Sequence, residues 1–123
     1  MDDAIRHART ISLITFRKDG TPVATPVTPA VVDGTLCTIT VADSWKAKRL
    51  ARNPKVRVAP CTLLGRVLGE YRDGTARVIA GSEAQDRVRA AYIARFGWLG
   101  RVSIIAGRLR RSDDERRVIE ITF

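Results

Sequence analysis

Residues 43–54 read DSWKAKRLARNP, and KVRVA follows at residues 55–59. Asp43 and Ser44 are both suitable helix N-caps, because their side chains accept hydrogen bonds from the free N–H groups of a first turn. Pro54 sets the latest plausible end of the helix, since the residue before a proline avoids helical geometry. The alternation of apolar and charged residues after it is typical of a half-buried strand. The stretch therefore predicts a short helix that leads directly into a strand.

The positive charges of this predicted helix lie at its unfavourable end. Lys46 and Lys48 fall in the first turn, where the helix dipole is positive and acidic residues are favoured. Lys48 and Arg52 are four residues apart, and such a like-charge pair costs roughly 0.2–0.5 kcal/mol. A bound anion would reverse these signs, because backbone N–H groups, the dipole and two ammonium groups would converge on it. We therefore predict a phosphate site here, with a solvated basic face as the alternative.

The net charge of +9 is strongly basic, and nucleic acid is the first partner that such a charge suggests. Most of this charge comes from arginine, and the only lysines are at positions 18, 46, 48 and 55. The clustering of two of these lysines carries more weight than the total charge. The sequence also lacks a basic helix with base-reading polar side chains, so we do not expect nucleic-acid binding.

Length and composition indicate a single domain, residues 1–123. Hydrophobic residues make up 45% of the chain, which is typical of a folded globular protein. No apolar run approaches the roughly 20 residues that span a bilayer. The first residues, MDD, are acidic where a secretory signal would be basic. We therefore expect a cytoplasmic protein without a membrane partner.

The inventory of reactive side chains excludes several kinds of site. Cys37 and Cys61 lack the CxxC or paired-histidine spacing of a zinc site and lie in apolar, strand-like segments, so we expect buried free thiols. His7 is the only histidine, which excludes a catalytic triad and a histidine metal site elsewhere in the chain. We therefore predict no catalytic side chain and no metal ligand. If the protein is an enzyme, a bound cofactor must supply the difficult chemistry.

Alternation and turn residues predict a mainly β (α+β) chain. Asp-Gly pairs at 19–20 and 33–34 each predict a hairpin turn. Pro22, Pro26 and Pro29 make the second strand irregular or place it at an edge. A further Asp-Gly pair at 73–74 could interrupt its strand with a turn. The predicted strands are residues 11–17, 22–28, 30–32, 36–41, 55–59, 70–80 and 116–123.

Two or three short helices are expected beside the strands. The first covers residues 3–9, the second is the basic helix, and a third begins at a capping box, in which Ser82 is the N-cap and Gln85 bonds back to it. Gly97 ends this third helix. Residues 98–109 are ambiguous between a helix and a strand, with helix preferred. The apolar face of the third helix consists of Ala84, Val88, Ala91, Tyr92 and Phe96.

These elements describe a small β-barrel of six or seven strands with helical decoration. The Rossmann glycine pattern and the Walker A pattern are both missing from the sequence. A nucleotide-type cofactor would therefore need a different cradle.

Residues 15–23 (TFRKDGTPV), 25–27 (TPV) and 44–56 (SWKAKRLARNPKV) resemble sequence blocks of the flavin and deazaflavin split-barrel superfamily, whose namesake is pyridoxamine 5′-phosphate oxidase. The last block is similar to the S-R-K-A…N-N-P-R-V phosphate-binding helix and following strand of that family. Residues 96–101 (FGWLGR) and 118–121 (VIEI) are similar to its small, single-domain actinobacterial members, which use the deazaflavin coenzyme F420. The resemblance covers nearly the whole chain and implies a split β-barrel.

One departure from the family pattern distinguishes its subgroups. The FMN-dependent oxidases carry two cations on the second strand, which help to hold the FMN phosphate. The aligned positions here are Thr25 and Ala30, and neither supplies a charge. The resemblance therefore implies F420 as the cofactor, with Lys46 and Lys48 carrying most of the phosphate binding. FMN is the alternative cofactor.

The resemblance also implies roles for single residues. The helix start would hold the cofactor phosphate, and two neighbouring strands would lie along the ring system and offer it backbone or hydroxyl hydrogen bonds. Surface arginines would attract the polyglutamate tail of F420. The residues expected at the phosphate are Ser44, Lys46 and Lys48, with Arg49 assisting, and those along the ring are Thr25, Pro26, Val27 and Thr40. The plainer alternative is that both threonines are only strand formers.

Family members are homodimers with cofactor sites at the subunit interface, so the resemblance implies a homodimer here. Tyr92, Phe96, Trp98 and Leu99 offer an apolar cluster to a partner subunit, or they belong to the barrel's own core. The implied activity is an oxidoreductase reaction, hydride transfer between reduced F420 and an unsaturated small-molecule substrate. The alternatives are an FMN-binding oxidase or reductase and a non-catalytic protein that binds or stores F420.

Overall fold

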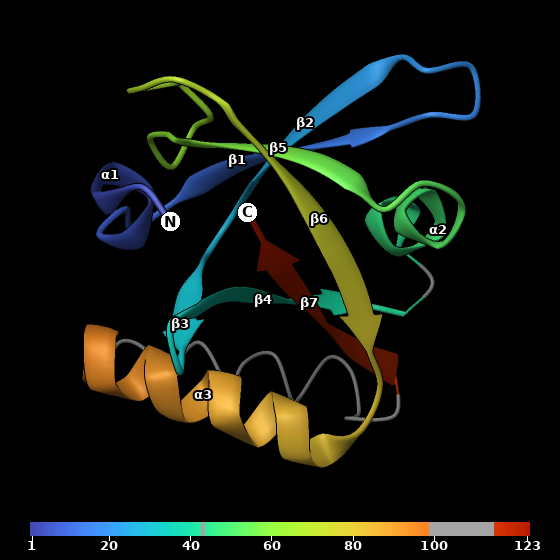
Figure 1. Cartoon of the computed structure of the whole chain (residues 1–123). Coiled ribbons are helices and arrows are strands. Elements are labelled where there is room, and N and C mark those ends of the chain that lie inside the picture. The colour runs from blue at the N-terminus through green and yellow to red at the C-terminus, as the bar shows by residue number, and fades with distance from the viewer. Residues whose placement is uncertain (43, 99–114) are drawn as a thin grey trace.

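The computed structural model describes residues 1–42, 44–98 and 115–123. These residues form a mainly-β split barrel, in which one antiparallel sheet of seven strands is accompanied by three helices (Figure 1). The predicted fold class is confirmed, and each predicted strand is present. The strands are β1 (Ile11–Phe16), β2 (Pro22–Val27), β3 (Ala30–Val32), β4 (Thr35–Val41), β5 (Lys55–Pro60), β6 (Arg72–Ile79) and β7 (Arg116–Thr122). The helices are α1 (Asp3–Arg6), α2 (Trp45–Arg52) and α3 (Ser82–Phe96).

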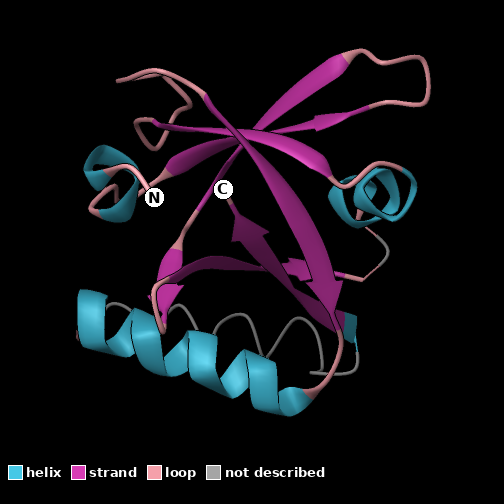
Figure 2. Ribbon diagram, in the orientation of Figure 1, coloured by secondary structure: helices cyan, strands magenta, loops and turns pink. Residues whose placement is uncertain are grey.

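The sheet curls into a half-barrel, and the chain itself joins its two edges. The strand order is β2-β1-β5-β6-β7-β4-β3, so β2 and β3 are the edge strands although they follow one another in sequence. Figure 2 shows the chain running from β2 down to β3. Proline cannot donate a hydrogen bond to a neighbouring strand, which explains why the proline-containing β2 lies at an edge. The predicted edge position is confirmed.

Both predicted hairpin turns are present. Gly20 has a φ of +89°, and its N–H donates to Arg17 O at 2.9 Å in the turn between β1 and β2. Asp33 and Gly34 form the two-residue turn between β3 and β4, with φ values of 50° and 79°. A type I′ turn needs positive φ at both central residues, and aspartate and glycine tolerate it well.

The buried apolar side chains form two clusters. The first fills the barrel interior, and Leu50 anchors α2 to it. The second lies between the sheet and α3. Complete burial of one such side chain contributes about 1.5–3 kcal/mol, so a single leucine is a substantial anchor for the short helix α2. The interior cluster comprises Ile5, Ile11, Leu13, Leu36, Leu50, Val56, Val58, Ala76, Ile119 and Ile121. The buried members of the second cluster are Ala30, Cys37, Val88 and Val118.

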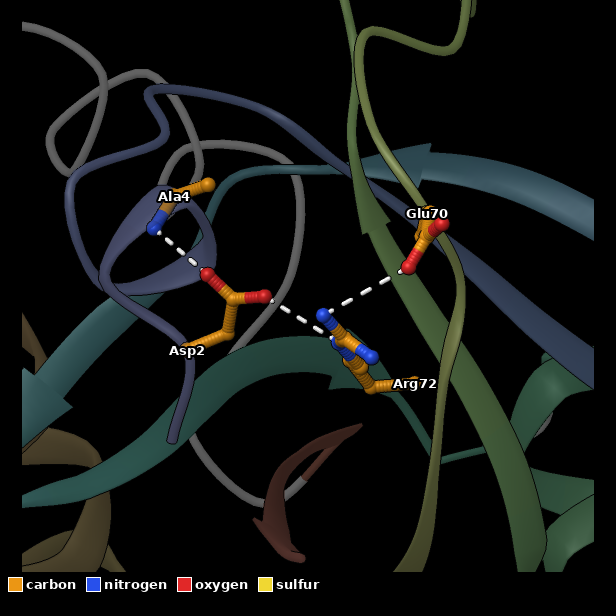
Figure 3. Close-up of polar contacts among 4 residues, drawn as sticks. All are labelled: Asp2, Ala4, Glu70 and Arg72. Carbon is orange, nitrogen blue, oxygen red and sulfur yellow. Dashed lines mark hydrogen bonds and ion pairs between the residues drawn. The ribbon is translucent and has the colours of Figure 1, made fainter.

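The acidic N-terminus has a structural role (Figure 3). Asp2 is the N-cap of α1, and its Oδ1 accepts a hydrogen bond from the Ala4 N–H at 2.9 Å. Its Oδ2 accepts from Arg72 Nε at 3.1 Å, and Arg72 Nη2 lies 3.6 Å from Glu70 Oε2. The bond from Ala4 and then that from Arg72 lower the pKa of Asp2. These contacts tie α1 to the start of β6.

The start of α3 differs from the prediction. Its N-cap is Gly81, which makes no side-chain cap bond, and Ser82 is already helical. Gln85 is fully buried, and its Nε2 donates to Arg116 O at 3.2 Å, while its Oε1 accepts from Arg89 Nη2 at 2.9 Å. The predicted capping box is therefore wrong, because the glutamine joins the helix to β7 instead of bonding back to the helix start.

Four of the five residues predicted for the apolar face of α3 belong to the protein's own core. The fifth, Phe96, is in neither cluster, and its ring centroid lies 6.4 Å from that of Tyr92. Ala84, Val88, Ala91 and Tyr92 pack in the second cluster, and Tyr92 Oη donates to Thr28 O at 2.9 Å. Gly97 ends the helix with a φ of 60°, as predicted. Trp98 is 72% exposed. The remainder of the ambiguous segment 98–109, including Leu99, lies outside the described residues.

Asp73-Gly74 does not turn the chain. The strand β6 continues through both residues, and Gly74 pairs with Val56 of β5. A Cβ atom on Gly74 would lie 2.9 Å from Thr122 O, which is closer than such contacts allow. The predicted interruption is wrong because this glycine permits a close approach of β7 and not a change of direction.

Candidate functional site

A side-chain cap fixes the start of α2. Ser44 is the N-cap, with φ and ψ of −66° and 156°, and its Oγ accepts a hydrogen bond from the Ala47 N–H at 3.1 Å. Thr40, buried near the end of β4, has its Oγ1 3.0 Å from the same hydroxyl. The predicted cap at Ser44 and the helix end before Pro54 are confirmed, and the alternative cap Asp43 lies outside the described residues. Two predicted site residues, Ser44 and Thr40, are thus in direct contact.

The helix start offers further donors to a ligand. No hydrogen bond from the backbone N–H of Trp45 or Lys46 occurs within the described part of the chain, as expected for the first residues of a helix. If the hydroxyl of Thr40 donates to Ser44, the hydroxyl hydrogen of Ser44 is also free to donate. Backbone N–H groups at the positive end of the helix dipole fit the oxygens of a phosphate.

Lys46 and Arg49 place two positive charges on one flank of α2. Arg49 Nη1 donates to the buried Thr15 Oγ1 of β1 at 3.4 Å, which holds this flank against the barrel. Burial, and then repulsion from Arg49, lower the pKa of the half-buried Lys46. Within residues 1–42, 44–98 and 115–123, neither side chain forms an ion pair with a carboxylate. A half-buried cation beside another cation is unfavourable for the fold alone.

Lys48 lies on a different flank of the helix. Its Nζ is 4.8 Å from the centroid of the Trp45 ring, a cation–π contact. Trp45 is 71% exposed and stands between Ser44 and Lys46, where the S-R-K-A motif has an arginine. The two lysines predicted to hold one phosphate are therefore directed to different neighbours, Lys46 to Arg49 and Lys48 to Trp45.

The predicted ring-binding residues of β2 do not share a face. Thr25 and Val27 are half-buried, and Val27 packs against the interior cluster, whereas Pro26 is exposed on the opposite face of the strand. The strands β2 and β4 are also not neighbours, because β2 pairs with β1 and β4 lies between β7 and β3. The expected placement of Thr40 on a strand next to Thr25 is therefore wrong. Thr40 instead joins Ser44 at the helix start.

Thr25 and Ala30, the two positions at which the expected cations are missing, have different surroundings. Ala30 is 1% exposed and belongs to the second apolar cluster, beneath α3. A charged side chain at Ala30 would be buried among apolar groups without a partner. Thr25 is half-buried on the barrel side of β2. Neither position therefore supplies a positive charge.

The glycines at 65 and 69 predict a loop over residues 65–69, but sequence reasoning missed its apolar surface and its position beside β2. We define the apolar loop as residues 62–69, between β5 and β6. The loop is internally bonded, with the N–H of Thr62 donating to Arg66 O at 2.8 Å and that of Gly65 to Thr62 O at 2.9 Å. A Cβ atom on Gly65 would lie 3.9 Å from Pro26 Cγ, so the loop lies against the outer face of β2. The paired leucines directly before Gly65 were the available signal. The exposed apolar residues of this loop are Leu63 (79%), Leu64 (95%), Val67 (41%) and Leu68 (61%).

Cys37 and Cys61 are buried free thiols, as predicted. Burial raises the pKa of Cys37 to about 11 and also raises the pKa of Cys61, so neither thiol is activated as a nucleophile. Cys61 forms an isolated bridge with Val67 at the base of the apolar loop. The described residues contain no group of three His, Cys, Asp or Glu side chains that could hold a metal ion. None of the helices they form is long and apolar enough to cross a membrane.

Comparison with known proteins identifies relatives of the chain. Among protein families, pyridoxamine 5′-phosphate oxidase matches the whole chain, residues 1–123. Among curated protein sequences there is no match. A solved structure, the conserved hypothetical protein Rv2991 from Mycobacterium tuberculosis, is 26% identical with a TM-score of 0.72, over 98% of this chain and 76% of that one.

Two more distant structures show the fold alone. HutZ, the heme storage protein from Vibrio cholerae, is 17% identical with a TM-score of 0.69, over 98% of this chain and 84% of its own. General Stress Protein 26 from Bacillus anthracis is 23% identical with a TM-score of 0.64, over 98% and 83% of the two chains. Because the family match extends over every residue, this chain belongs to the pyridoxamine 5′-phosphate oxidase family, whose split-barrel fold binds flavins or heme.

Proposed function

We propose that this protein is an F420-dependent oxidoreductase that transfers a hydride between reduced F420 and an unsaturated organic substrate. The start of α2 carries the proposal, because Lys46 is half-buried beside Arg49 without a carboxylate partner in the described part of the chain. A phosphate there would accept hydrogen bonds from the helix-start N–H groups and from the ammonium of Lys46. Membership of the family makes a flavin-type cofactor the expected owner of that phosphate.

The preference for F420 over FMN rests on Thr25 of β2 and Ala30 of β3. The FMN-dependent relatives place two cations at the positions of Thr25 and Ala30, and this chain has a half-buried threonine and a buried alanine there. The helix start must then hold the phosphate largely by itself. FMN is the second candidate cofactor, because the fold is the same and Lys46 is available to either phosphate.

When bound, F420 supplies the carbon atom that gives or accepts the hydride. The side chains of this protein bind and orient the cofactor. Lys46 and Ser44 donate to the phosphate, and Arg49 adds positive charge from a position fixed by Thr15. Pro26 and the apolar loop provide an apolar wall beside β2 that excludes water from a planar ring. Orientation and exclusion of water are sufficient for hydride transfer, so no side chain is assigned as acid or base.

We also propose that the protein acts as a homodimer with the cofactor at the subunit interface. Leu63 and Leu64 are 79% and 95% exposed in a single chain, and contiguous exposed apolar groups mark contact sites. The apolar loop lies against Pro26 on the predicted ring-binding strand. A second subunit bound to this loop would therefore also cover the cofactor.

Titration of the purified protein with F420, followed by the fluorescence of the cofactor, tests the proposed function. We expect saturable binding and an increase in Kd of about tenfold or more for Lys46→Ala, which is the effect of losing one charge-assisted hydrogen bond. Lys55→Ala is the matched control, since Lys55 is an exposed lysine at the start of β5. Absence of saturable binding, or equal Kd values for wild type and Lys46→Ala, would contradict the proposal.

Two further measurements separate the alternatives. A yellow, flavin-loaded preparation, or tighter binding of FMN than of F420, would favour an FMN-dependent oxidase or reductase. Tight binding of F420 without turnover of ene, quinone or tetrapyrrole substrates would favour a binding or storage protein. Reduction of one of these substrates by reduced F420 supports the oxidoreductase.

A further inference from the structure

An exposed tryptophan stands directly beside the predicted phosphate site. Trp45 is the first residue of α2, between the N-cap Ser44 and Lys46, and it is 71% exposed. A large aromatic side chain that stays exposed to water contributes little to the stability of the fold. The first turn of a helix also favours small or acidic residues. The part of the chain that the structure describes therefore gives no reason for a tryptophan at this position.

The ammonium group of Lys48 lies over one face of the Trp45 ring. The two residues are three apart on the helix and so share a face. Lys48 Nζ lies 4.8 Å from the ring centroid, and Lys48 forms no ion pair with a carboxylate within the described residues. The ammonium covers part of the ring, and most of the side chain stays open to solvent. The pair presents a flat apolar surface and a positive charge side by side.

Successive residues of an α-helix are about 100° apart around the axis. Trp45 and Lys46 therefore belong to one helix start but face different directions, and Lys46 shares its flank with Arg49, which bonds to Thr15. Trp45 is also four residues from Arg49, about 40° around the axis, and Lys48 lies on the other side of Trp45. The Trp45–Lys48 pair therefore borders the cationic flank and continues it around the helix. A ligand that ends at its phosphate is served by the Lys46 flank alone, whereas a ligand that continues beyond its phosphate also meets the pair.

We propose that Trp45 and Lys48 bind the part of the ligand that lies beyond the phosphate, a planar group that carries negative charge. The ring packs on the planar group, and the ammonium pairs with the charge. A glutamyl tail, with its planar amide and carboxylate groups, has this chemistry, and F420 has such a tail whereas FMN ends at the phosphate. The pair is then the element that makes the helix start specific for F420. The inference rests on the proposed function for the identity of the ligand.

Affinity measurements on single variants test the pair. We expect Trp45→Ala and Lys48→Ala each to raise the Kd for F420 about five- to tenfold. The double variant is expected to fall well short of the product of the two effects, because the residues act as a unit. Lys48→Arg keeps the charge and can still stack on the ring, so it is expected to weaken F420 binding less than Lys48→Ala does. Trp98→Ala is the matched control, since Trp98 is 72% exposed and lies just beyond the end of α3.

A second measurement does not depend on the cofactor. In Trp98→Phe, Trp45 is the only tryptophan, and in Trp45→Phe, Trp98 is the only one. A triglutamate peptide, which does not absorb where tryptophan emits, is expected to change the emission of Trp45 and not that of Trp98. Inorganic phosphate at equal ionic strength is expected to leave both unchanged, because it fills only the Lys46 flank.

The two measurements decide every case. If the wild type binds F420, equal Kd values for wild type, Trp45→Ala and Lys48→Ala overturn the inference and leave the proposed function in place. If the wild type does not bind F420, the proposed function fails. The peptide titration then decides, and an unchanged Trp45 emission overturns the inference.

Discussion

At Lys46, burial and the charge of Arg49 act in the same direction, and both lower the pKa of the lysine. In the ligand-free protein, the surroundings of Lys46 therefore disfavour its protonated form. Protonated Lys46 consequently lowers the stability of the fold, and this effect begins to disappear as the pH rises through the lowered pKa. A bound phosphate has the opposite influence, because a nearby negative charge favours the ammonium and raises its pKa. Ligand binding and protonation of Lys46 are thus linked.

The affinity for F420 is accordingly expected to fall as the medium becomes alkaline. The fall begins at a lower pH than an ordinary lysine would give, since the pKa of Lys46 lies below the usual 10.5 in the free protein. The measurement is the Kd for F420 at a series of pH values and constant ionic strength, which keeps screening unchanged. Lys46→Arg stays charged over this range and provides the control. Wild-type and Lys46→Arg profiles of the same shape would contradict the linkage.

At the scale of elements, local signals predicted the structure well. The basic helix begins at its predicted N-cap Ser44 and ends before Pro54, because both signals act on the backbone within a few residues. The turn at Asp33-Gly34 follows from the positive φ that these residues tolerate. Such features depend on neighbours in sequence, so a single sequence contains what is needed to predict them.

Features that depend on distant strands were missed or mistaken. Gln85 looked like the end of a capping box, but its partner is Arg116 O, a residue of β7. Thr40 was expected on a strand next to β2, but β2 is an edge strand whose neighbour is β1. The hydroxyl of Thr40 contacts Ser44 instead. The candidate site divides in the same way. Its helix start was predictable, and so was the separation of Lys46 from Lys48, because residues two apart on a helix lie about 200° apart around its axis. Which of the two lysines is half-buried depends instead on how the helix packs against the barrel.

Gly74 offers a test at the scale of the sheet. Gly74→Ala is expected to destabilise the fold by about 1–3 kcal/mol, because the added Cβ would meet Thr122 O at 2.9 Å and force β6 and β7 apart. Urea unfolding measures the change in the free energy of unfolding. Thr75→Ala, an exposed neighbour on the same strand, is the control and is expected to change stability by less than about 1 kcal/mol. A Gly74→Ala variant as stable as this control would contradict the close-approach explanation.

For the whole molecule, two surface features without a clear role in the single chain both contact the β1–β2 hairpin. The cationic flank of α2 reaches β1 through Arg49 and Thr15, and the apolar loop reaches β2 at Pro26. The loop is also close to β1, where Ser12 Oγ and Tyr71 Oη are 2.8 Å apart just after the loop ends. A phosphate-bearing, largely planar ligand needs both kinds of surface. Thr15 is buried in the core whereas Pro26 lies on the outer face, so the two surfaces are on opposite faces of the hairpin in a single chain. A partner subunit is then needed to bring both kinds of surface to one ligand.

Leu64 tests that assembly. Its side chain is 95% exposed in the single chain, so Leu64→Glu leaves the fold unchanged but places a charge in the proposed interface. The wild type is expected to be a dimer by analytical ultracentrifugation, and Leu64→Glu a monomer with weaker F420 binding and an unchanged melting temperature when no ligand is present. Trp98→Glu, which alters an equally accessible aromatic group after α3, is expected to remain dimeric. A dimer that withstands Leu64→Glu and dissociates with Trp98→Glu would place the interface at α3, and the cofactor strand β2 would then have to be covered by the chain itself.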